Sequence, residues 1–361
     1  MASEAEVRLR LKTDLEYYAK KCLKIRGKDK LQNFILNKAQ LYIHDLLEKQ
    51  LLETGRVRAI ILKGRQQGCS TYAEARLMWK VTHTKGVRAF ILTHEESASQ
   101  TLFEMAKRYY DNLPDQIKPS ISAVNSKELR FDKLDSGYRV GTAGNKSVGR
   151  SQTNQFFHGS EVAFWPNAAE HAKGILQTVP NSDNTEVIYE STANGVGNFF
   201  HEQWKAAESG ESDFIAIFVP WFWQDEYRRV APQDIELTQD EVDLKNYYLI
   251  DNDQIFWRRK KIIELSSGGM DGVKAFNQEY PMNSVEAFQV SGGDGLIKAE
   301  HVLKARNCEV TGSGQLIVGV DPSRGGDRFS IVKRLGRKAY DLRNWKGDEI
   351  DKLGKAVSKC K

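Results

Sequence analysis

The fold is decided by residues 57–71, whose sequence is VRAIILKGRQQGCST. The apolar run from Ala59 to Leu62 predicts a buried strand, and residues 70–81 predict a helix. A polar loop with glycines at positions 64 and 68 joins the two. A strand, a glycine-bearing loop and a helix are the parts of a phosphate-binding P-loop, because the curled backbone and the helix N-terminus both turn N–H groups toward an anion.

The loop departs from the usual P-loop pattern, G-x-x-x-x-G-K-[ST]. Gly68 and Ser70 fit, and Ser70 would be the hydroxyl on the Mg²⁺ side. Cys69 stands at the usual lysine position and supplies no charge. Lys63 stands where the first glycine is usual, and from that end its side chain can still reach the β- and γ-phosphates, with Arg65 as a second cation. An ordinary strand, turn and helix with chance glycines is the alternative for this stretch taken alone.

Length and composition indicate a two-domain protein without a membrane-spanning segment. The 361 residues leave room for two domains, and a hydrophobic content of 40% is enough for sizeable cores. No apolar run approaches the ~20 residues that span a bilayer. The net charge of +5 permits a polyanionic partner without requiring one. The cysteines are scattered, which indicates thiols of a reducing compartment rather than a metal site: Cys22, Cys69, Cys308 and Cys360.

A second apolar segment ends in a carboxylate. Residues 155–165 have the sequence QFFHGSEVAFW, which delivers Glu161 to a strand end. This is the layout of a Walker B strand, whose acid at the edge of the phosphate site polarises the water that attacks the γ-phosphate. Ser160 takes the place of the usual metal-side aspartate, so Glu161 is the predicted general base. Without the P-loop upstream, a lone glutamate at a strand end would be the simpler explanation.

Further strands alternate with helices up to residue 219. A strand predicted at 186–190 ends in Ser191, Thr192 and Ala193. Small hydroxyls at the end of a core strand can hydrogen-bond the γ-phosphate or its water, and can report hydrolysis to the next segment. Strands that alternate with helices of this length predict a parallel α/β sheet.

An adenine-binding residue is predicted ahead of the first strand. Phe34 and Gln40 could hold the base, because an aromatic ring stacks on it and an amide pairs with its edge. The alternative places Gln40 on the outside of a helix that runs to Glu53.

The amino-acid composition changes from Pro220 onward. Aromatic residues fall among many charges, and helices are predicted within 239–265, which indicates a smaller helical subdomain. Its run Arg258-Arg259-Lys260-Lys261 is either a surface for DNA or a solvated face.

Residues 316–327 predict an apolar strand that delivers Asp321, then a glycine turn and a second strand. A carboxylate on the first strand of a β-meander is how two-metal nucleases of RNase H-like build begin. Such a site needs further acids, so on this chain alone the nuclease site is incomplete.

Together these stretches resemble the large terminase subunit of tailed double-stranded DNA phages. The resemblance is carried by five motifs in the family's order: Lys63–Thr71, Ser160–Trp165, Glu190–Gly195, Glu279-Tyr280-Pro281 with Glu286-Ala287-Phe288, and Gly319–Pro322. It implies an ASCE-type P-loop NTPase with a parallel sheet, a small helical subdomain and the start of a truncated RNase H-like nuclease domain. The expected boundaries are an N-terminal helical segment at 1–33, the ATPase core at 34–220, the helical subdomain and linker at 221–312, and the nuclease start at 313–361.

The resemblance also implies a function. Members of this family pump double-stranded DNA into a procapsid at the expense of ATP, and their nuclease cuts the DNA concatemer. The implied cofactors are ATP and Mg²⁺ at the ATPase site, with Mg²⁺ or Mn²⁺ at a complete nuclease site. The implied partners are double-stranded DNA, the portal protein, the small terminase subunit and further copies of the chain in a ring, all in the host cytoplasm.

Carried over to this sequence, the resemblance assigns roles to individual residues. Glu161 would be the catalytic acid, Arg65 would assist it, and Arg150 would reach the ATP of a neighbouring subunit as an arginine finger does. Gln40 would contact adenine. Phosphates and Mg²⁺ would be held by Lys63, Gly64, Arg65, Gln66, Gln67, Gly68, Cys69, Ser70 and Thr71, with Ser70 as the metal ligand. Ser191, Thr192 and Ala193 would form the coupling motif, and Asp321, with Asp327 as a further candidate, would begin the nuclease metal site.

Two other functions compete with packaging. The chain could be a P-loop helicase or another nucleic-acid remodelling ATPase, although a helicase would more often carry a second motor domain where the nuclease-like strand stands. It could also be a degenerate P-loop protein that serves as a structural ring subunit. The retained Glu161 argues against that alternative, because a dead site has no need for this acid.

Overall fold

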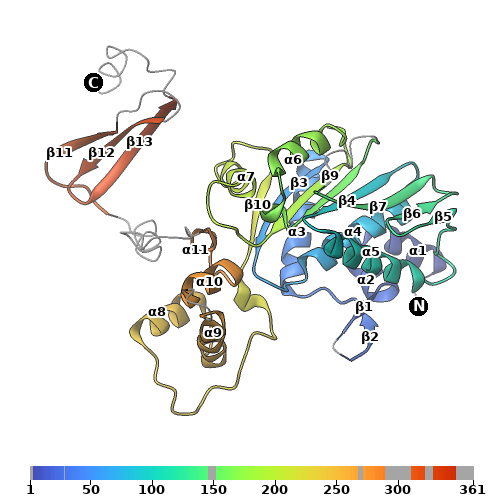
Figure 1. The fold of residues 1–361 in the computed structure, drawn as a ribbon, viewed down its shortest axis with the longest axis horizontal. Helices are drawn as coiled ribbons and strands as arrows, with labels where there is room; N and C mark the ends of the chain where they lie inside the picture. The colour runs from blue at the N-terminus through green and yellow to red at the C-terminus, as the bar shows by residue number, and fades with distance from the viewer. Residues whose placement is uncertain are drawn as a thin grey trace. The chain divides into compact units, whose positions relative to one another are not determined.

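The computed structural model describes residues 3–27, 29–144, 152–266, 271–288, 310–321 and 328–346 (Figure 1). The chain forms two units, Met1–Gly293 and Asp294–Lys361. Each unit contains its own sheet, so each is described by itself. No helix in the described part of the chain is both long and apolar enough to cross a membrane.

The larger unit is built on an eight-stranded sheet with the order β10-β3-β9-β8-β4-β7-β6-β5. Neighbours from β10 to β7 run parallel, and β6 and β5 add an antiparallel edge. The strands are β3 (Val57–Lys63), β4 (Arg88–Thr93), β5 (Ala123–Val124), β6 (Glu128–Phe131), β7 (Ser136–Thr142), β8 (Phe156–Ser160), β9 (Glu186–Ser191) and β10 (Ile215–Val219). The predicted α/β class with a parallel sheet is confirmed.

Helices cover both faces of this sheet, and β3 shows why. Its alternating side chains enter two separate cores, with Ala59 and Ile61 on one face and Ile60 and Leu62 on the other. A strand that is buried at every position and apolar from Ala59 to Leu62 fits this doubly covered environment. One face packs against α1 (Glu4–Thr13), α2 (Leu15–Cys22), α3 (Lys38–Thr54), α4 (Cys69–His83) and α5 (Glu96–Asp111). The other packs against η1 (Val162–Phe164), α6 (Ala168–Leu176) and α7 (Phe199–Glu208).

The N-terminal segment differs from a purely helical one. After α1 and α2 the chain forms an antiparallel hairpin of β1 (Lys24–Arg26) and β2 (Leu31–Asn33). Leu15 and Tyr18 of α2 are buried in the same core as α4, and Tyr18 is fully buried. Lys24 and Arg26 therefore lie on a short hairpin within the segment expected to be helical at 1–33, and the Gly27 N–H donates to Lys30 O at 2.9 Å.

The segment after Pro220 forms the predicted helices around an aromatic cluster. Trp221 is fully buried and stacks on Trp257 at 5.0 Å between ring centroids, and Tyr227 stacks on Trp257 at 4.5 Å. This apolar content holds together η2 (Trp221–Trp223), α8 (Gln239–Tyr248), α9 (Asn252–Leu265) and α10 (Gly272–Glu279). The short α11 (Ser284–Ala287) instead buries Ala287 in the core that also contains α7.

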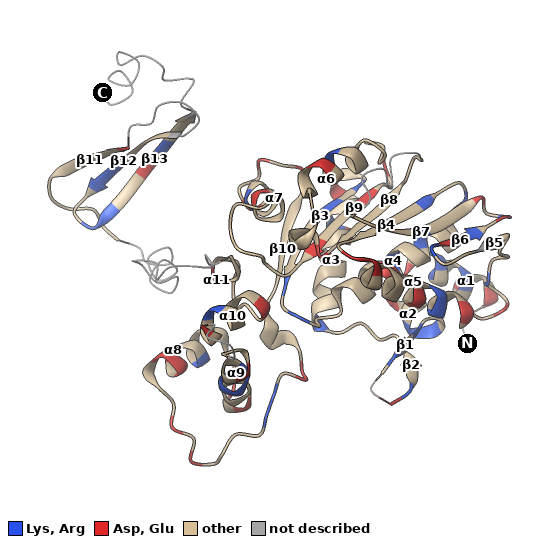
Figure 2. Ribbon diagram, viewed as in Figure 1, with Lys and Arg blue, Asp and Glu red and all other residues tan. Residues whose placement is uncertain are grey.

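The basic run on α9 has local partners. The Arg258 guanidinium lies over the Phe276 ring at 5.3 Å, and Arg259 Nε donates to Glu241 Oε1 on α8 at 2.6 Å. Lys261 Nζ donates to Glu264 Oε2 at 2.8 Å. Acidic and basic residues both occur along α8 and α9 (Figure 2), so the basic run lies among acidic residues.

The smaller unit contains a three-stranded antiparallel meander, β11 (Leu316–Asp321), β12 (Arg328–Leu335) and β13 (Lys338–Lys346). The predicted strand that delivers Asp321 is present, and Asp321 is exposed and lies opposite Ser330. Asp327 lies outside the described residues. The assignment of this meander to an RNase H-like nuclease stays a prediction.

One buried ion pair ties α4 to the start of β9. Arg76 donates to both carboxylate oxygens of Glu186 at 2.7 and 3.0 Å, and both side chains are fully buried. Burial alone would raise the pKa of Glu186, but the Arg76 charge lowers it to about 2. We expect Arg76→Met to lower the free energy of unfolding by about 3–5 kcal/mol, because the buried Glu186 carboxylate loses both of these hydrogen bonds and keeps Lys80, at 3.2 Å, as its cation. Denaturant unfolding would measure this loss.

The control for that variant is Arg8→Met. Arg8 pairs with Glu4 at 2.7 Å on the surface of α1, where both side chains are mostly exposed. The expected change is at most ~1 kcal/mol, since exposed ion pairs contribute little. Equal losses in the two variants would contradict the role given to Arg76.

Candidate functional site

The loop between β3 and α4 is curled as a phosphate-binding loop requires. Gln66 and Gly68 both adopt the left-handed conformation, with φ of 51° and 76°. Within the described residues, the backbone N–H groups of Gln66, Gln67 and Gly68 donate to no protein acceptor. Free N–H groups on a curled backbone ahead of a helix N-terminus form an anion-binding concavity. The loop therefore has the geometry predicted for residues 64–68.

The N-terminal end of α3 holds this loop on one side. Gln40 Nε2 donates to Gly68 O at 2.8 Å, and Asn37 Nδ2 donates to Gln67 O at 3.2 Å. A Cβ atom at Gly68 would lie 2.5 Å from Gln40 Nε2, so a glycine is required here on two grounds. Gln40 is 3% exposed, which excludes its placement on the outside of the helix. Its predicted contact with adenine stays a prediction.

The helical subdomain holds the loop on the other side. Tyr227 Oη donates to Arg65 O at 2.6 Å, and Gln224 Nε2 donates to Gln66 O at 2.9 Å. Gln67 Nε2 in turn donates to Trp221 O at 3.1 Å. These hydrogen bonds connect the loop to residues far along the sequence. A movement of the helical subdomain would therefore displace the loop backbone.

Arg65 is bound to the helical subdomain in this structure. Its backbone N–H donates to Glu279 O at 2.9 Å, and its side chain forms an ion pair with the Glu279 carboxylate. That hydrogen bond and the Glu279 charge raise the pKa of Arg65. The Arg65 side chain is 53% exposed, so it has freedom to exchange this carboxylate for another anion. Its predicted roles toward phosphate and in catalysis require that exchange.

Lys63, at the end of β3, lies between two carboxylates. Its Nζ is 2.7 Å from Glu161 Oε1 and 3.4 Å from Glu190 Oε2. Burial alone would lower the pKa of Lys63, but Glu190 and Glu161 raise it well above its ordinary value. The lysine is therefore charged and buried, and β9, which carries Glu190, lies between β3 and β8 in the sheet. The predicted cation and the predicted general base are in direct contact.

Glu161 occupies a strained backbone position. Its φ and ψ are 53° and 47°, a left-handed conformation that costs a non-glycine residue energy. Its Oε2 accepts hydrogen bonds from Ser191 Oγ at 3.3 Å and from the Thr192 backbone N–H at 3.4 Å. The predicted base and two members of the predicted coupling motif are thus in contact, and the third, Ala193, is fully buried beside them in the chain.

Glu190 is central to the site, although the sequence analysis gave it no role. Its Oε1 accepts from Ser70 Oγ at 2.6 Å and from Ser160 Oγ at 2.9 Å. It is fully buried, and although burial would raise its pKa, Lys63 and His158 lower that pKa well below its usual range. The available signal was an acid directly after the apolar middle of a short strand.

A buried histidine and glutamate extend this network away from the loop. His158 Nδ1 is 2.6 Å from Glu74 Oε1, and His158 Nε2 is 3.6 Å from Glu190 Oε1. Burial would lower the pKa of His158, but the two nearby carboxylates, Glu190 and Glu74, raise it to about 9. His158 is therefore a cation at neutral pH. Glu74 lies one helical turn after Ser70 on α4, which is the sequence signal that could have located it.

The remaining predicted residues are placed as follows. Cys69 is buried, and burial together with Glu190 raises the pKa of its thiol, so it stays neutral and supplies no charge of either sign. Thr71 O accepts from Tyr109 Oη at 3.1 Å, which ties α4 to α5.

Arg150 lies outside the described residues, and Asp321 belongs to the smaller unit. Within the described ranges no cluster of three or more His, Cys, Asp or Glu side chains is arranged to hold a metal by itself.

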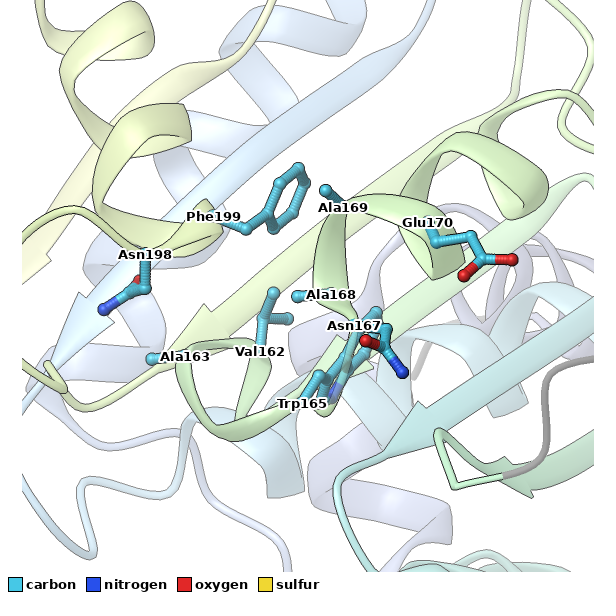
Figure 3. A pocket seen from close by; sticks show the side chains of 9 residues that line it. All are labelled: Val162, Ala163, Trp165, Asn167, Ala168, Ala169, Glu170, Asn198 and Phe199. Carbon is cyan, nitrogen blue, oxygen red and sulfur yellow. The ribbon is translucent and has the colours of Figure 1, made fainter.

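A pocket of about 430 Å³ lies beside the turn that follows Glu161 (Figure 3). Val162, Trp165 and Asn167 line it together with Asn198 and Phe199 from the start of α7. None of the residues predicted to bind phosphate lines this pocket. The pocket is therefore separate from the cluster around Lys63.

The fold is similar to those of several solved structures. The large terminase of bacteriophage HK97 matches with a TM-score of 0.55 at 14% identity, over 92% of this chain and 67% of that one. The ATPase domain of the Thermus phage P74-26 large terminase gives 0.47 at 16% identity, over 69% and 94%. A large terminase from a thermophilic bacteriophage, in complex with ADP, gives 0.46 at 10% identity, over 90% and 73%.

A scan against protein families finds no match. The match to the HK97 protein extends over nearly the whole chain, and the fold expected from the sequence motifs is the fold it has. This chain has the fold of a bacteriophage large terminase subunit.

Proposed function

We propose that this chain is the ATPase subunit of a phage DNA-packaging motor, which hydrolyses ATP to move double-stranded DNA into a procapsid. The observation that carries the proposal is the contact between Lys63 and Glu161 at the mouth of a curled loop. A buried cation beside a carboxylate, at the ends of two strands that β9 separates, is an arrangement that suits phosphoryl transfer to water. The large-terminase fold supplies the context of packaging.

Lys63 would bind the β- and γ-phosphates of ATP. The same ammonium group is paired with Glu161 in this structure. Phosphate oxygens would compete with Glu161 for Lys63, because both are anions that accept charge-assisted hydrogen bonds from it. Nucleotide binding would thereby release the Glu161 carboxylate, so that hydrolysis is prepared only when the phosphates are in place.

Glu161, once released, would accept the proton of the attacking water. Ser191 and the Thr192 backbone N–H hold the other carboxylate oxygen, which fixes its orientation. A change in the Glu161 carboxylate would reach these residues through the same bonds, and this supports the coupling role proposed for Ser191, Thr192 and Ala193. Bound Mg²⁺, held at Ser70, would neutralise the charge that develops on the phosphates.

The proposed partners follow from the packaging role. They are double-stranded DNA, the portal protein, the small terminase subunit and further copies of this chain in a ring, in the host cytoplasm. Arg150 is proposed to reach the ATP of the neighbouring copy. A nuclease that cuts the DNA concatemer, with Asp321 as its first ligand for Mg²⁺ or Mn²⁺, is proposed for a chain that carries the further acids.

ATP hydrolysis measured at several protein concentrations, with and without double-stranded DNA, tests this function. We expect dilute protein to hydrolyse ATP slowly, and the rate per subunit to rise as subunits associate. An arginine finger supplied in trans raises kcat by a factor of about 10³–10⁵ in related chemistry. Arg150→Ala should remove the rise. Arg130→Ala is the matched control, because Arg130 lies on β6, next to the last strand of the sheet, near Glu128.

The competing functions predict different results. Strand separation of a tailed duplex, driven by ATP, would identify a helicase. A folded protein that neither binds nor hydrolyses ATP at any concentration would identify a degenerate ring subunit, and would overturn the proposal.

A further inference from the structure

The Walker B strand of this protein lacks a metal-side carboxylate. Ser160 ends β8 at the position where an aspartate is usual, and a hydroxyl carries no charge. The neighbouring strand supplies a carboxylate at the same level of the sheet. Glu190 of β9 lies opposite Ser160 in the register, and Ser160 Oγ donates to Glu190 Oε1 at 2.9 Å.

The same carboxylate oxygen orients the hydroxyl predicted to bind the metal. Ser70 Oγ donates its proton to Glu190 Oε1 at 2.6 Å. A hydroxyl that binds a cation through a lone pair keeps its proton, and it must give that proton to an acceptor. Glu190 is this acceptor, so Ser70 has a lone pair free for a cation.

The second oxygen of Glu190 is not satisfied in this structure. Glu190 Oε2 is buried and makes no hydrogen bond, and its nearest cation is Lys63 Nζ at 3.4 Å. A buried carboxylate oxygen without a hydrogen bond is costly, so the site fits a further donor at this atom. Mg²⁺ usually keeps several waters and is held through one or two carboxylates together with substrate phosphates. Ser70 and Glu190 fit such an ion, with the Ser70 hydroxyl as a direct ligand and the Glu190 carboxylate as an acceptor for its waters.

We propose that Glu190, contributed by β9, takes the place of the missing Walker B aspartate. It orients Ser70 as a direct ligand of Mg²⁺ and accepts hydrogen bonds from the water ligands of the ion. This inference deepens the proposed function and rests on it. Glu190 is a positioning residue in this scheme, whereas Glu161 is the base.

A purely structural role for Glu190 makes a different prediction. Glu190 also faces Lys63 and His158, and it could serve only as their counter-ion. In that case its loss would lower stability but leave the Mg²⁺ dependence of nucleotide binding unchanged. Metal-dependent binding therefore separates the two roles without any use of hydrolysis.

The experiment measures the affinity of the chain for a fluorescent non-hydrolysable ATP analogue, with and without Mg²⁺, and the binding of Mn²⁺ by electron paramagnetic resonance. Loss of a group that orients a metal ligand typically weakens metal binding by about 10- to 100-fold. Glu190→Gln should lose that much of the affinity gained with the metal. Glu186→Gln, which removes an equally buried carboxylate at the other end of β9, should not.

A second variant keeps the proposal falsifiable if Glu190→Gln fails to fold. Ser160→Asp combined with Glu190→Gln moves the carboxylate to β8 and retains the buried charge. It should restore the Mg²⁺ dependence and the Mn²⁺ signal of the wild type. Unchanged metal dependence in folded Glu190→Gln, or no metal dependence in the folded double variant, would overturn the assignment and leave the proposed ATPase intact. Failure of the wild type to bind the nucleotide would overturn both.

Discussion

Replacement of Glu161 by glutamine is expected to abolish ATP hydrolysis while nucleotide binding is retained. A positioned general base accelerates a reaction by a factor of about 10²–10⁴, and glutamine cannot accept the proton of the attacking water. Glutamine keeps nearly the same shape, so Ser191 and the Thr192 N–H can still bond its carbonyl oxygen. The ion pair with Lys63 is lost, which leaves that cation free for phosphate.

Two measurements test this expectation together. Steady-state hydrolysis should fall to the background rate, and the affinity for the non-hydrolysable analogue should stay equal to that of the wild type or rise. Rising affinity is the distinctive result, because it shows that Glu161 competes with phosphate for Lys63. Glu211→Gln, at an exposed surface position, should change neither quantity. A variant that keeps more than about a tenth of the wild-type rate would place the base elsewhere.

Local pattern was enough to predict the elements that carry the site. Residues 59–62 are apolar without interruption because β3 is covered on both faces, and that signal lies entirely within the segment. Glu161 was found the same way, since an apolar run that ends in an acid is a local feature. The α/β class follows from strands and helices in alternation.

The partners of these residues could not be predicted in the same way. The position of Glu190 depends on the insertion of β9 between β3 and β8, and the order of strands in a sheet is not written in any one segment. Arg65 pairs with Glu279, which lies in the helical subdomain far along the chain. Gln40 bonds the carbonyl of Gly68, a contact that depends on where α3 docks. Long-range packing decides all three.

The role of Cys69 shows how the two levels combine. The sequence places an uncharged residue at the usual lysine position, which by itself weakens the case for a working loop. The structure supplies the missing charge from Lys63 at the other end of the loop, and it holds the cysteine buried and neutral. One cation at the end of β3 therefore has to serve both phosphate binding and the neutralisation of two carboxylates.

Replacement of Lys63 by methionine tests that dual role. We expect it to lower the stability of the nucleotide-free protein and also to weaken nucleotide binding. Without nucleotide, Glu161 and Glu190 lose their shared cation, and removal of one member of a buried ion pair costs about 3–5 kcal/mol. Denaturant unfolding of the free protein should show a loss of this size. Lys80→Met is the matched control for stability. Lys80 lies on α4, the helix that follows the loop, and its Nζ is 3.2 Å from the buried Glu186 carboxylate.

Nucleotide affinity should fall in Lys63→Met and not in Lys80→Met. Hydrogen bonds with charged groups contribute about 1.5–3 kcal/mol, so the loss should be about 10- to 100-fold. Lys63→Arg keeps the charge but presents a planar fork in place of a point charge, and it should recover stability more fully than affinity. If Lys63→Met folds and binds the nucleotide as tightly as the wild type, another cation holds the phosphates, and Arg65, once released from Glu279, would be the residue to replace next.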